Sequence, residues 1–339
     1  MRAKRWIVTI GGVCVLLSAL AAFPTHGSAA VPAENARVLS GSPYGFRSPG
    51  AIVNDGSHLW IANLTGNSIT EVDNTSGAWL RTLSGAPYGF KRPVSLAFDG
   101  AHVWVANFLS NTVTEFNAAD GSWMRTLQGD TYQFSFPSAI AFDGSDIWVT
   151  NLGAGTLTEL AGGDGSVIRV MPERNGQDDL PCALAADAAQ VWVANCGSNS
   201  VSVIATPTGY PVDVLSGATY GFQDPDALAF DGGSVWVANG MGNSLTEVDR
   251  HARRLVRIRG GPVAGLRDPC ALATGGGRLW VTNCGSNTLA VVDSSDAVVH
   301  SASSGKHSQL EVPMGVVHTP GAVWVSNAGN GTVVQLRTP

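Results

Sequence analysis

The sequence predicts an all-β fold, a seven-bladed β-propeller with four-stranded blades of 44 residues, and three observations carry this prediction. A unit typified by PDALAFDGGSVWVAN (Pro225 to Asn239) occurs seven times along the chain. Successive copies are 44 residues apart, with no insertion or deletion. Each copy has a tryptophan eleven residues after its first proline, and an asparagine three residues after that tryptophan. A period of about 40 to 50 residues with short apolar runs is typical of propellers, with one blade per repeat.

Each unit contains two short apolar runs that predict a hairpin of strands A and B. In the fifth unit these runs are 227–230 and 235–238, and the pair Asp231-Gly232 between them permits the positive φ of a tight turn. Strand C and strand D follow, the latter as in 79–83 and 123–127. One position between B and C is restricted to Asn or Gly, which indicates a left-handed backbone in that turn: Asn67, Asn111, Gly155, Asn199, Asn243, Asn287 and Gly331.

Small residues recur on strand A, which suits an innermost strand where seven sheets crowd the axis, and the tryptophan of strand B is expected to fill the space between blades. The asparagine that ends strand B recurs in every blade, so we expect it to satisfy backbone groups and not a ligand. The residue after each proline is expected to face the mouth of the central channel. These residues are Gly50, Val94, Ser138, Cys182, Asp226, Cys270 and Met314.

The two ends of the repeat array are predicted to complete one blade. Residues 35–48 (NARVLSGSPYGFRS) resemble 79–92 (WLRTLSGAPYGFKR) and precede the first full unit. The last unit, 313–339, has strands A, B and C but stops where D should begin. Residues 35–48 should therefore supply strand D of the blade formed by 313–339, and this 3+1 closure removes the exposed edges of an open ring.

Residues 1–30 are predicted to be a secretory signal peptide. A basic start (1–5), an apolar core (6–23) and the small-residue site Ser28-Ala29-Ala30 fit this pattern. Residues 31–339 would then form a single propeller domain, secreted or extracytoplasmic, with no membrane span after cleavage. Removing the segment takes away three basic and no acidic residues, which changes the net charge from −6 to −9. This acidic balance argues against nucleic acid as a partner.

Four cysteines remain after the signal segment, and they occupy identical places in the fourth and sixth units. Disulfides Cys182–Cys196 and Cys270–Cys284 are predicted, because one cysteine begins strand A and the other follows strand B at the same end of the hairpin. An exported protein permits such bridges. Free buried thiols are an alternative. A metal site is disfavoured because the two pairs lie in non-adjacent blades.

The units LWIANLTGNSITEVD (59–73) and VWVANCGSNSVSVI (191–204) resemble the repeats of the NHL and YVTN class of bacterial seven-bladed propellers, and more distantly those of streptogramin B lyases. The lyase resemblance would imply acids and histidines that hold magnesium near the axis. The lyase repeat typically ends Trp-Phe-Thr-Glu, whereas Asn stands at the matching position of all seven units. His58 and His102 fall in A–B turns at the opposite end, and only His318 lies on an inner strand. No catalytic residue, metal ligand or cofactor is therefore predicted.

A break in the sevenfold pattern indicates where a partner could bind. Residues common to all blades serve the fold, whereas a ligand usually contacts residues that only some blades have. The B–C turns of the first three units add apolar residues, Leu64, Phe108 and Leu152. Four D–A connections carry an aromatic motif that contributes Tyr44, Tyr88, Tyr132 and Tyr220. Both connections should lie on one face, where an apolar patch is a candidate contact surface. The alternative is that the phenylalanines of these connections pack between blades and the tyrosines cover them.

Three functions fit these observations. The first is a secreted recognition or scaffold propeller that binds a protein, peptide or glycan on its turn-bearing face. The second, a metal-dependent lyase of the streptogramin B lyase type, is disfavoured by the missing acids. A quinone-cofactor enzyme is disfavoured because the blade repeat already explains the tryptophans.

Overall fold

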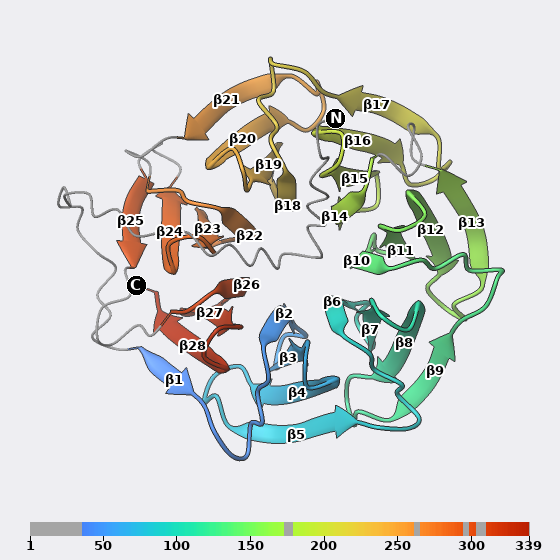
Figure 1. The fold of residues 1–339 in the computed structure, drawn as a ribbon, viewed down its shortest axis with the longest axis vertical. Coiled ribbons are helices and arrows are strands. Elements are labelled where there is room, and N and C mark those ends of the chain that lie inside the picture. Colours follow the sequence, from blue (N-terminus) through green and yellow to red (C-terminus); the bar gives the residue numbers. More distant parts are fainter. Residues whose placement is uncertain (1–35, 173–178, 261–264, 294–297, 303–309, 339) are drawn as a thin grey trace, which may run out of the picture.

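The computed structural model describes residues 36–172, 179–260, 265–293, 298–302 and 310–338, and it confirms the predicted fold. Seven four-stranded antiparallel sheets stand around a central axis, as Figure 1 shows. Within these ranges the structure has no helix of the length and apolarity that a membrane crossing needs. The predicted signal peptide, residues 1–30, lies outside the described residues, so it remains a prediction.

Blades one to six each run from the innermost strand A to the outermost strand D in sequence order, whereas in blade seven a strand from the N-terminal end takes the outermost place. Blade one has β2 (Pro49–Asn54), β3 (His58–Asn63), β4 (Ser68–Asp73) and β5 (Trp79–Ser84). Blade two has β6 (Pro93–Phe98), β7 (His102–Asn107), β8 (Thr112–Asn117) and β9 (Trp123–Leu127). Blade three has β10 (Pro137–Phe142), β11 (Asp146–Asn151), β12 (Thr156–Ala161) and β13 (Val167–Pro172). Blade four has β14 (Pro181–Ala186), β15 (Gln190–Asn195), β16 (Ser200–Ala205) and β17 (Pro211–Leu215).

The remaining blades repeat this order. Blade five has β18 (Pro225–Asp231), β19 (Ser234–Asn239), β20 (Ser244–Asp249) and β21 (Leu255–Gly260). Blade six has β22 (Pro269–Gly275), β23 (Arg278–Asn283), β24 (Thr288–Asp293) and β25 (Val298–Ala302). Blade seven has β26 (Pro313–Thr319), β27 (Ala322–Asn327), β28 (Thr332–Arg337) and β1 (Arg37–Leu39).

Blade seven closes the ring with strands from both ends of the described chain. β1 pairs antiparallel with β28, and Arg37, Val38 and Leu39 lie opposite Gln335, Val334 and Val333. Figure 1 shows β1, in blue, beside β28, in red. The predicted 3+1 closure is therefore confirmed, and β28 does not end the sheet as an unpaired edge.

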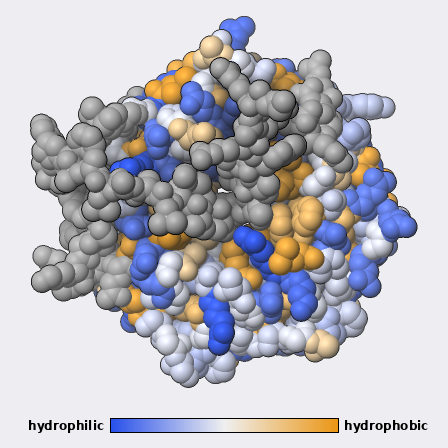
Figure 2. All heavy atoms as spheres, in the orientation of Figure 1, coloured by the Kyte–Doolittle hydropathy of each residue, from blue (hydrophilic) through white to orange (hydrophobic). Residues whose placement is uncertain are grey.

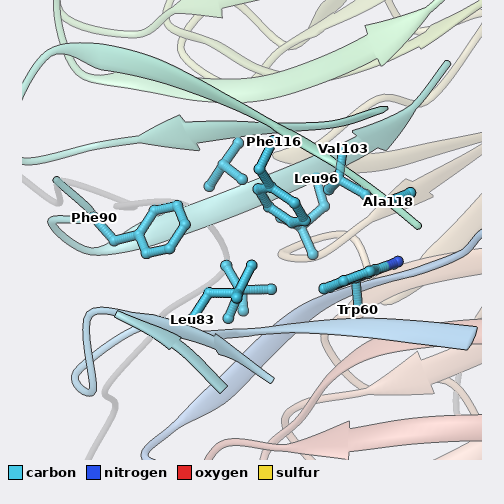
Figure 3. Packing of buried hydrophobic residues seen from close by; sticks show 10 residues of the cluster. Trp60, Leu83, Phe90, Leu96, Val103, Phe116 and Ala118 are labelled. Carbon is cyan, nitrogen blue, oxygen red and sulfur yellow. The ribbon is translucent and has the colours of Figure 1, made fainter. Parts of the chain in front are cut away.

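The core lies between neighbouring blades, as the sequence predicts for the tryptophans. Trp60 of blade one is fully buried, and its ring meets Phe116 of blade two edge-on at 4.9 Å between centroids. Phe90, from the connection between these blades, packs into the same cluster (Figure 3). Equivalent clusters fill the other interfaces, so burial of apolar area between sheets stabilises the ring as a whole.

Recurrent residues hold turns, the tryptophan in blades one to three and the asparagine in every blade. In blade one the Trp60 indole donates to Asp55 Oδ2 (2.9 Å), which ties strand B to the A–B turn. The Asn63 amide donates to Ser68 Oγ (3.1 Å) and Thr70 Oγ1 (2.9 Å) across the B–C turn. The position restricted to Asn or Gly is left-handed in all seven blades, with φ between 48° and 65°. The asparagine ring is therefore structural, as predicted.

Candidate binding site at the mouth of the central cavity

The D–A connections and B–C turns meet on one face of the ring, which we call the upper face. The residue before each strand A proline is left-handed, with φ between 48° and 56° in the seven blades. Its carbonyl accepts a hydrogen bond from the residue that follows the asparagine of strand B. In blade two the Phe108 amide donates to the Arg92 carbonyl at 3.1 Å. This bond joins connection and turn into one rim around the axis.

A cavity of about 210 Å³ lies at the centre of this face. The residue after each proline lines it, as predicted from the sequence: Gly50, Val94, Ser138, Cys182, Asp226, Cys270 and Met314. Because every blade contributes a different side chain except the two cysteines, the cavity is chemically asymmetric although the backbone repeats.

The two predicted disulfides are confirmed, and both stand at this rim. Cys182 is bonded to Cys196 and Cys270 to Cys284, with Cα–Cα distances of 6.1 and 6.0 Å. Each bridge joins the residue after the proline to the residue after the asparagine. Such bonds persist in oxidising surroundings and indicate an extracytoplasmic environment.

The same two positions form a size-matched pair in other blades. A Cβ on Gly50 would lie 2.2 Å from Leu64 Cδ1, so Leu64 fills the space above this glycine. In blade five the sizes are exchanged, because a Cβ on Gly240 would lie 2.2 Å from Asp226 Oδ2. Blade five therefore places a carboxylate where blades four and six place a disulfide.

This pairing corrects the expectation that Leu64, Phe108 and Leu152 form an exposed patch. Their side chains are buried, with exposed fractions of 5%, 3% and 6%. Phe108 packs against Phe136, with ring centroids 5.0 Å apart, and the guanidinium of Arg92 lies over its ring. Their position in turns predicts exposure, but in the structure they cover the inner strands. Packing accounts for them, and a direct role in binding remains a prediction.

Other apolar residues at this rim are exposed, and the sequence analysis missed them. They are Leu109 (59%), Phe136 (43%), Leu180 (37%) and Met241 (68%). Each either precedes a strand A proline, a position that differs in most units, or stands two residues after a strand B asparagine, where four units have glycine. Figure 2 shows hydrophobic surface beside the centre of the ring, over the part labelled β6 and β10 in Figure 1. Variation at these two positions was the signal that could have identified the residues.

Three carboxylates gather on the other side of the cavity mouth, in blades five and six. Burial, together with the nearby Asp224 and Asp268, raises the pKa of Asp226 to about 8. Burial also raises the pKa of Asp224 and of Asp268. This side of the rim therefore favours a positively charged group.

The four tyrosines are half-buried and lie away from the cavity lining. Each stacks on the phenylalanine two residues later, with ring centroids 5.3 to 5.4 Å apart. The hydroxyls of Tyr44, Tyr88 and Tyr220 donate to carbonyls of C–D turns, at Gly77 (2.9 Å), Gly121 (2.6 Å) and Arg253 (2.8 Å). These contacts give Tyr44, Tyr88, Tyr132 and Tyr220 a packing role between blades, while their role in binding stays a prediction.

The donor atoms at the mouth fit a metal ion poorly. The sulfurs of Cys182 and Cys196 and a carboxylate oxygen of Asp226 lie within 4.8 Å of one another. Both sulfurs belong to a disulfide, however, so they offer no thiolate. Among the described residues that line the cavity, Asp226 is the one acid, and none is a histidine. His318 of β26 stacks instead on Trp280 of blade six, where burial lowers its pKa.

Comparison with solved structures supports the same fold. The chain is similar to a streptogramin B lyase structure (TM-score 0.74, 18% identity, 88% of this chain and 96% of that chain). It is also similar to a catalytically inactive histidine-to-alanine variant of virginiamycin B lyase from Staphylococcus aureus with quinupristin (TM-score 0.75, 18% identity, 90% of this chain and 99% of that chain). A third similar structure is that of the RRP9 WD40 repeats (TM-score 0.70, 13% identity, 92% of this chain and 99% of that chain).

No family model and no curated protein matches the sequence. At identities of 18% and below, the solved structures show a shared propeller fold that carries lyases and WD40 repeats alike. The structural similarity to streptogramin B lyase is thus confirmed for the fold, while membership of the NHL or YVTN class remains a prediction.

Proposed function

We propose that this protein is a secreted recognition propeller that binds an extended protein segment, with adjacent apolar and basic side chains, at the mouth of its central cavity. One observation carries the proposal. The rim has exposed apolar residues in blades two to five and clustered carboxyl groups in blades five and six, where Asp226 and Asp268 both face Gly240, although the backbone is the same in all seven.

The apolar side supplies contact area. Leu109 and Phe136 come from the adjoining B–C turn of blade two and D–A connection of blade three, and Phe136 rests on the buried Phe108. A side chain that already packs against a buried neighbour loses little conformational entropy when a partner covers it, which favours binding. Exposed apolar groups that cluster on one face are a common mark of protein contact sites.

The acidic side supplies orientation. A lysine or arginine of the partner that approaches the mouth would meet the carboxyl groups of Asp224 and Asp268 at a partly buried site, and its positive charge would also favour loss of the proton from Asp226. Partial burial strengthens the attraction relative to open water. A segment with a basic residue next to apolar ones would therefore bind in one direction across the cavity.

The lyase alternative has less support in the residues of the mouth. Magnesium prefers several oxygen ligands, and acid–base catalysis needs a titratable group beside the substrate. The described lining offers one carboxyl group, Asp226, and no imidazole. The similarity to lyases is a similarity of fold and does not place their chemistry in this chain.

The proposal is tested by panning a phage library of random peptides against the protein without residues 1–30, and by measuring the enriched peptides in fluorescence anisotropy. We expect peptides that pair a basic with an apolar residue. Leu109→Ser and Asp268→Asn should each weaken their binding about tenfold, or about 1.4 kcal/mol. The matched control is Leu80→Ser, since Leu80 is 39% exposed on the outer strand β5, away from the mouth.

Two results would overturn the proposal. One is a set of peptides that binds the Leu109 and Asp268 variants as tightly as the parent, and the other is selective binding on a glycan array with no peptide enriched. Incubation with quinupristin and magnesium addresses the lyase alternative directly. Conversion of quinupristin to a product, followed by mass spectrometry, would favour that alternative.

A further inference from the structure

A second cluster of polar side chains lies on the opposite face, which is formed by the A–B and C–D turns and which we call the lower face. In blade two, Asp99 follows β6, His102 begins β7, and Glu115 lies on the neighbouring strand β8. His102 Nδ1 is 3.2 Å from Asp99 Oδ2 and 3.5 Å from Glu115 Oε1. All three atoms lie within 4.8 Å of one another.

Glu115 is the unusual member of this cluster. Its side chain is 1% exposed, and Arg125 Nε reaches only one oxygen, Oε2, at 2.9 Å. The other oxygen, Oε1, lies 3.5 Å from His102 Nδ1, and neither oxygen of this carboxyl group makes a hydrogen bond. A buried carboxyl oxygen without a donor is costly, and burial accordingly raises the pKa of Glu115. A cation between this oxygen and the other two groups would remove that cost.

The other two groups are held in place for such a role. Asp99 Oδ1 accepts the backbone amides of Ala101 (2.8 Å) and His102 (2.7 Å). Asp99 Oδ2 accepts the indole N–H of Trp104 at 2.7 Å. In metal sites, hydrogen bonds of this kind orient the side chains that bind the ion and fix their geometry before it binds.

We propose that Asp99, His102 and Glu115 form a zinc-binding site, with Asp99 Oδ2, His102 Nδ1 and Glu115 Oε1 as ligands. Ligands about 2.0 to 2.2 Å from a tetrahedral zinc ion are roughly 3.3 to 3.6 Å apart, close to the two His102 distances. One imidazole with two carboxylates suits zinc better than magnesium or calcium, which prefer oxygen alone. His102 is 27% exposed, so water reaches the fourth position.

Blade one repeats the arrangement, whereas blade three provides a natural comparison. His58 Nδ1 is 3.1 Å from Asp55 Oδ2 and 3.5 Å from Glu71 Oε1, and Glu71 Oε1 also lacks a hydrogen-bond partner. Blade three keeps the acids and the arginine but has Asp146 where the histidine stands. Blade one therefore offers a looser copy of the cluster, since its three atoms do not all lie within 4.8 Å of one another as those of blade two do, and blade three lacks the nitrogen ligand.

The test uses the protein without residues 1–30, stripped with a chelator and titrated with zinc in a calorimeter. His58→Gln leaves the blade-two site alone and should bind one zinc ion, whereas adding His102→Gln should abolish that binding. Cobalt in place of zinc should give a visible d–d spectrum in His58→Gln that is lost in the double variant. Thermal melting without metal checks that both variants fold.

A gain-of-function variant gives an independent readout. Asp146→His, placed in the double variant, should restore one zinc site in blade three, because Asp143 and Glu159 already stand in the equivalent places. The proposal is overturned if the folded double variant binds zinc as the parent does. It is also overturned if His58→Gln binds none and NMR finds His102 as an imidazolium, since a charge-balanced ion network would then explain the cluster.

Discussion

The side-chain oxygen of Asn111 accepts a hydrogen bond from the backbone N–H of Phe136 at 2.8 Å, across the boundary between blades two and three. Equivalent bonds cross four further boundaries, each 2.7 to 2.8 Å long. The left-handed asparagine of one B–C turn thus fixes the residue before the next blade's proline. At this boundary it positions an exposed aromatic side chain of the candidate binding site.

Replacing Asn111 should separate its two functions. Asn111→Gly keeps the left-handed backbone, where φ is 55°, but loses the bond to Phe136, and should cost about 1 kcal/mol. Asn111→Ala loses the bond and also strains the turn, and should cost about 1 kcal/mol more. Urea denaturation measures both values. Equal stability of the two variants would show that the backbone conformation contributes nothing here.

Phe108 and Leu109 are neighbours with opposite environments, so their variants should behave differently. Phe108→Ser should destabilise strongly, because emptying a buried aromatic site costs about 3 to 5 kcal/mol, and Trp104→Ala should cost a similar amount. Leu109→Ser should leave the melting temperature nearly unchanged, since its side chain is 59% exposed. Calorimetric melting of the three variants makes this comparison. A stable Phe108→Ser protein would contradict the packing role assigned to that residue.

Ring closure should depend on the N-terminal strand. A chain that begins at Pro49 lacks β1 and leaves β28 as an exposed edge. We expect a lower melting temperature and self-association, because unpaired strand edges recruit other chains. Light scattering after size-exclusion chromatography, alongside thermal melting, tests both effects. A monomer with the parent's melting temperature would refute the stabilising role of β1.

Asp226 should make stability depend on pH. Its pKa rises from 3.8 to about 8 on folding, so the folded state holds a proton that the unfolded state releases. The stability from this proton is complete below about pH 4 and is lost as pH rises through about 8. The melting temperature should therefore fall between pH 5 and pH 9 in the parent, and fall less in Asp226→Asn. Parallel curves for the two proteins would show that Asp226 titrates normally.

Much of the fold was predictable because the backbone needs the same groups in every blade. The proline, tryptophan and asparagine recur at fixed spacing since each sits at a turn or an interblade contact that no blade can omit. The cysteine pairs followed from the same register, because two positions at one end of a hairpin must be neighbours. These features depend on local geometry, which a repeat displays directly.

The candidate sites were less predictable because they depend on what faces each residue. Leu64 looked like a surface residue in its turn, but Gly50 on another strand leaves the space that it fills. His102 and Glu115 are thirteen positions apart and meet only through the pairing of β7 with β8. Burial and diagonal contacts of this kind come from tertiary packing, and one sequence does not display them.

The seam between β1 and β28 also constrains how the chain is made. Arg37 emerges from the ribosome early, and its partner Gln335 is synthesised 298 positions later. Until then β1 has no strand to pair with, and blades one to six form beside an open gap. The residues of β1 are thus synthesised first but make their hydrogen bonds to β28 last. A truncated product of interrupted translation would lack a closed ring and would be readily recognised by proteases.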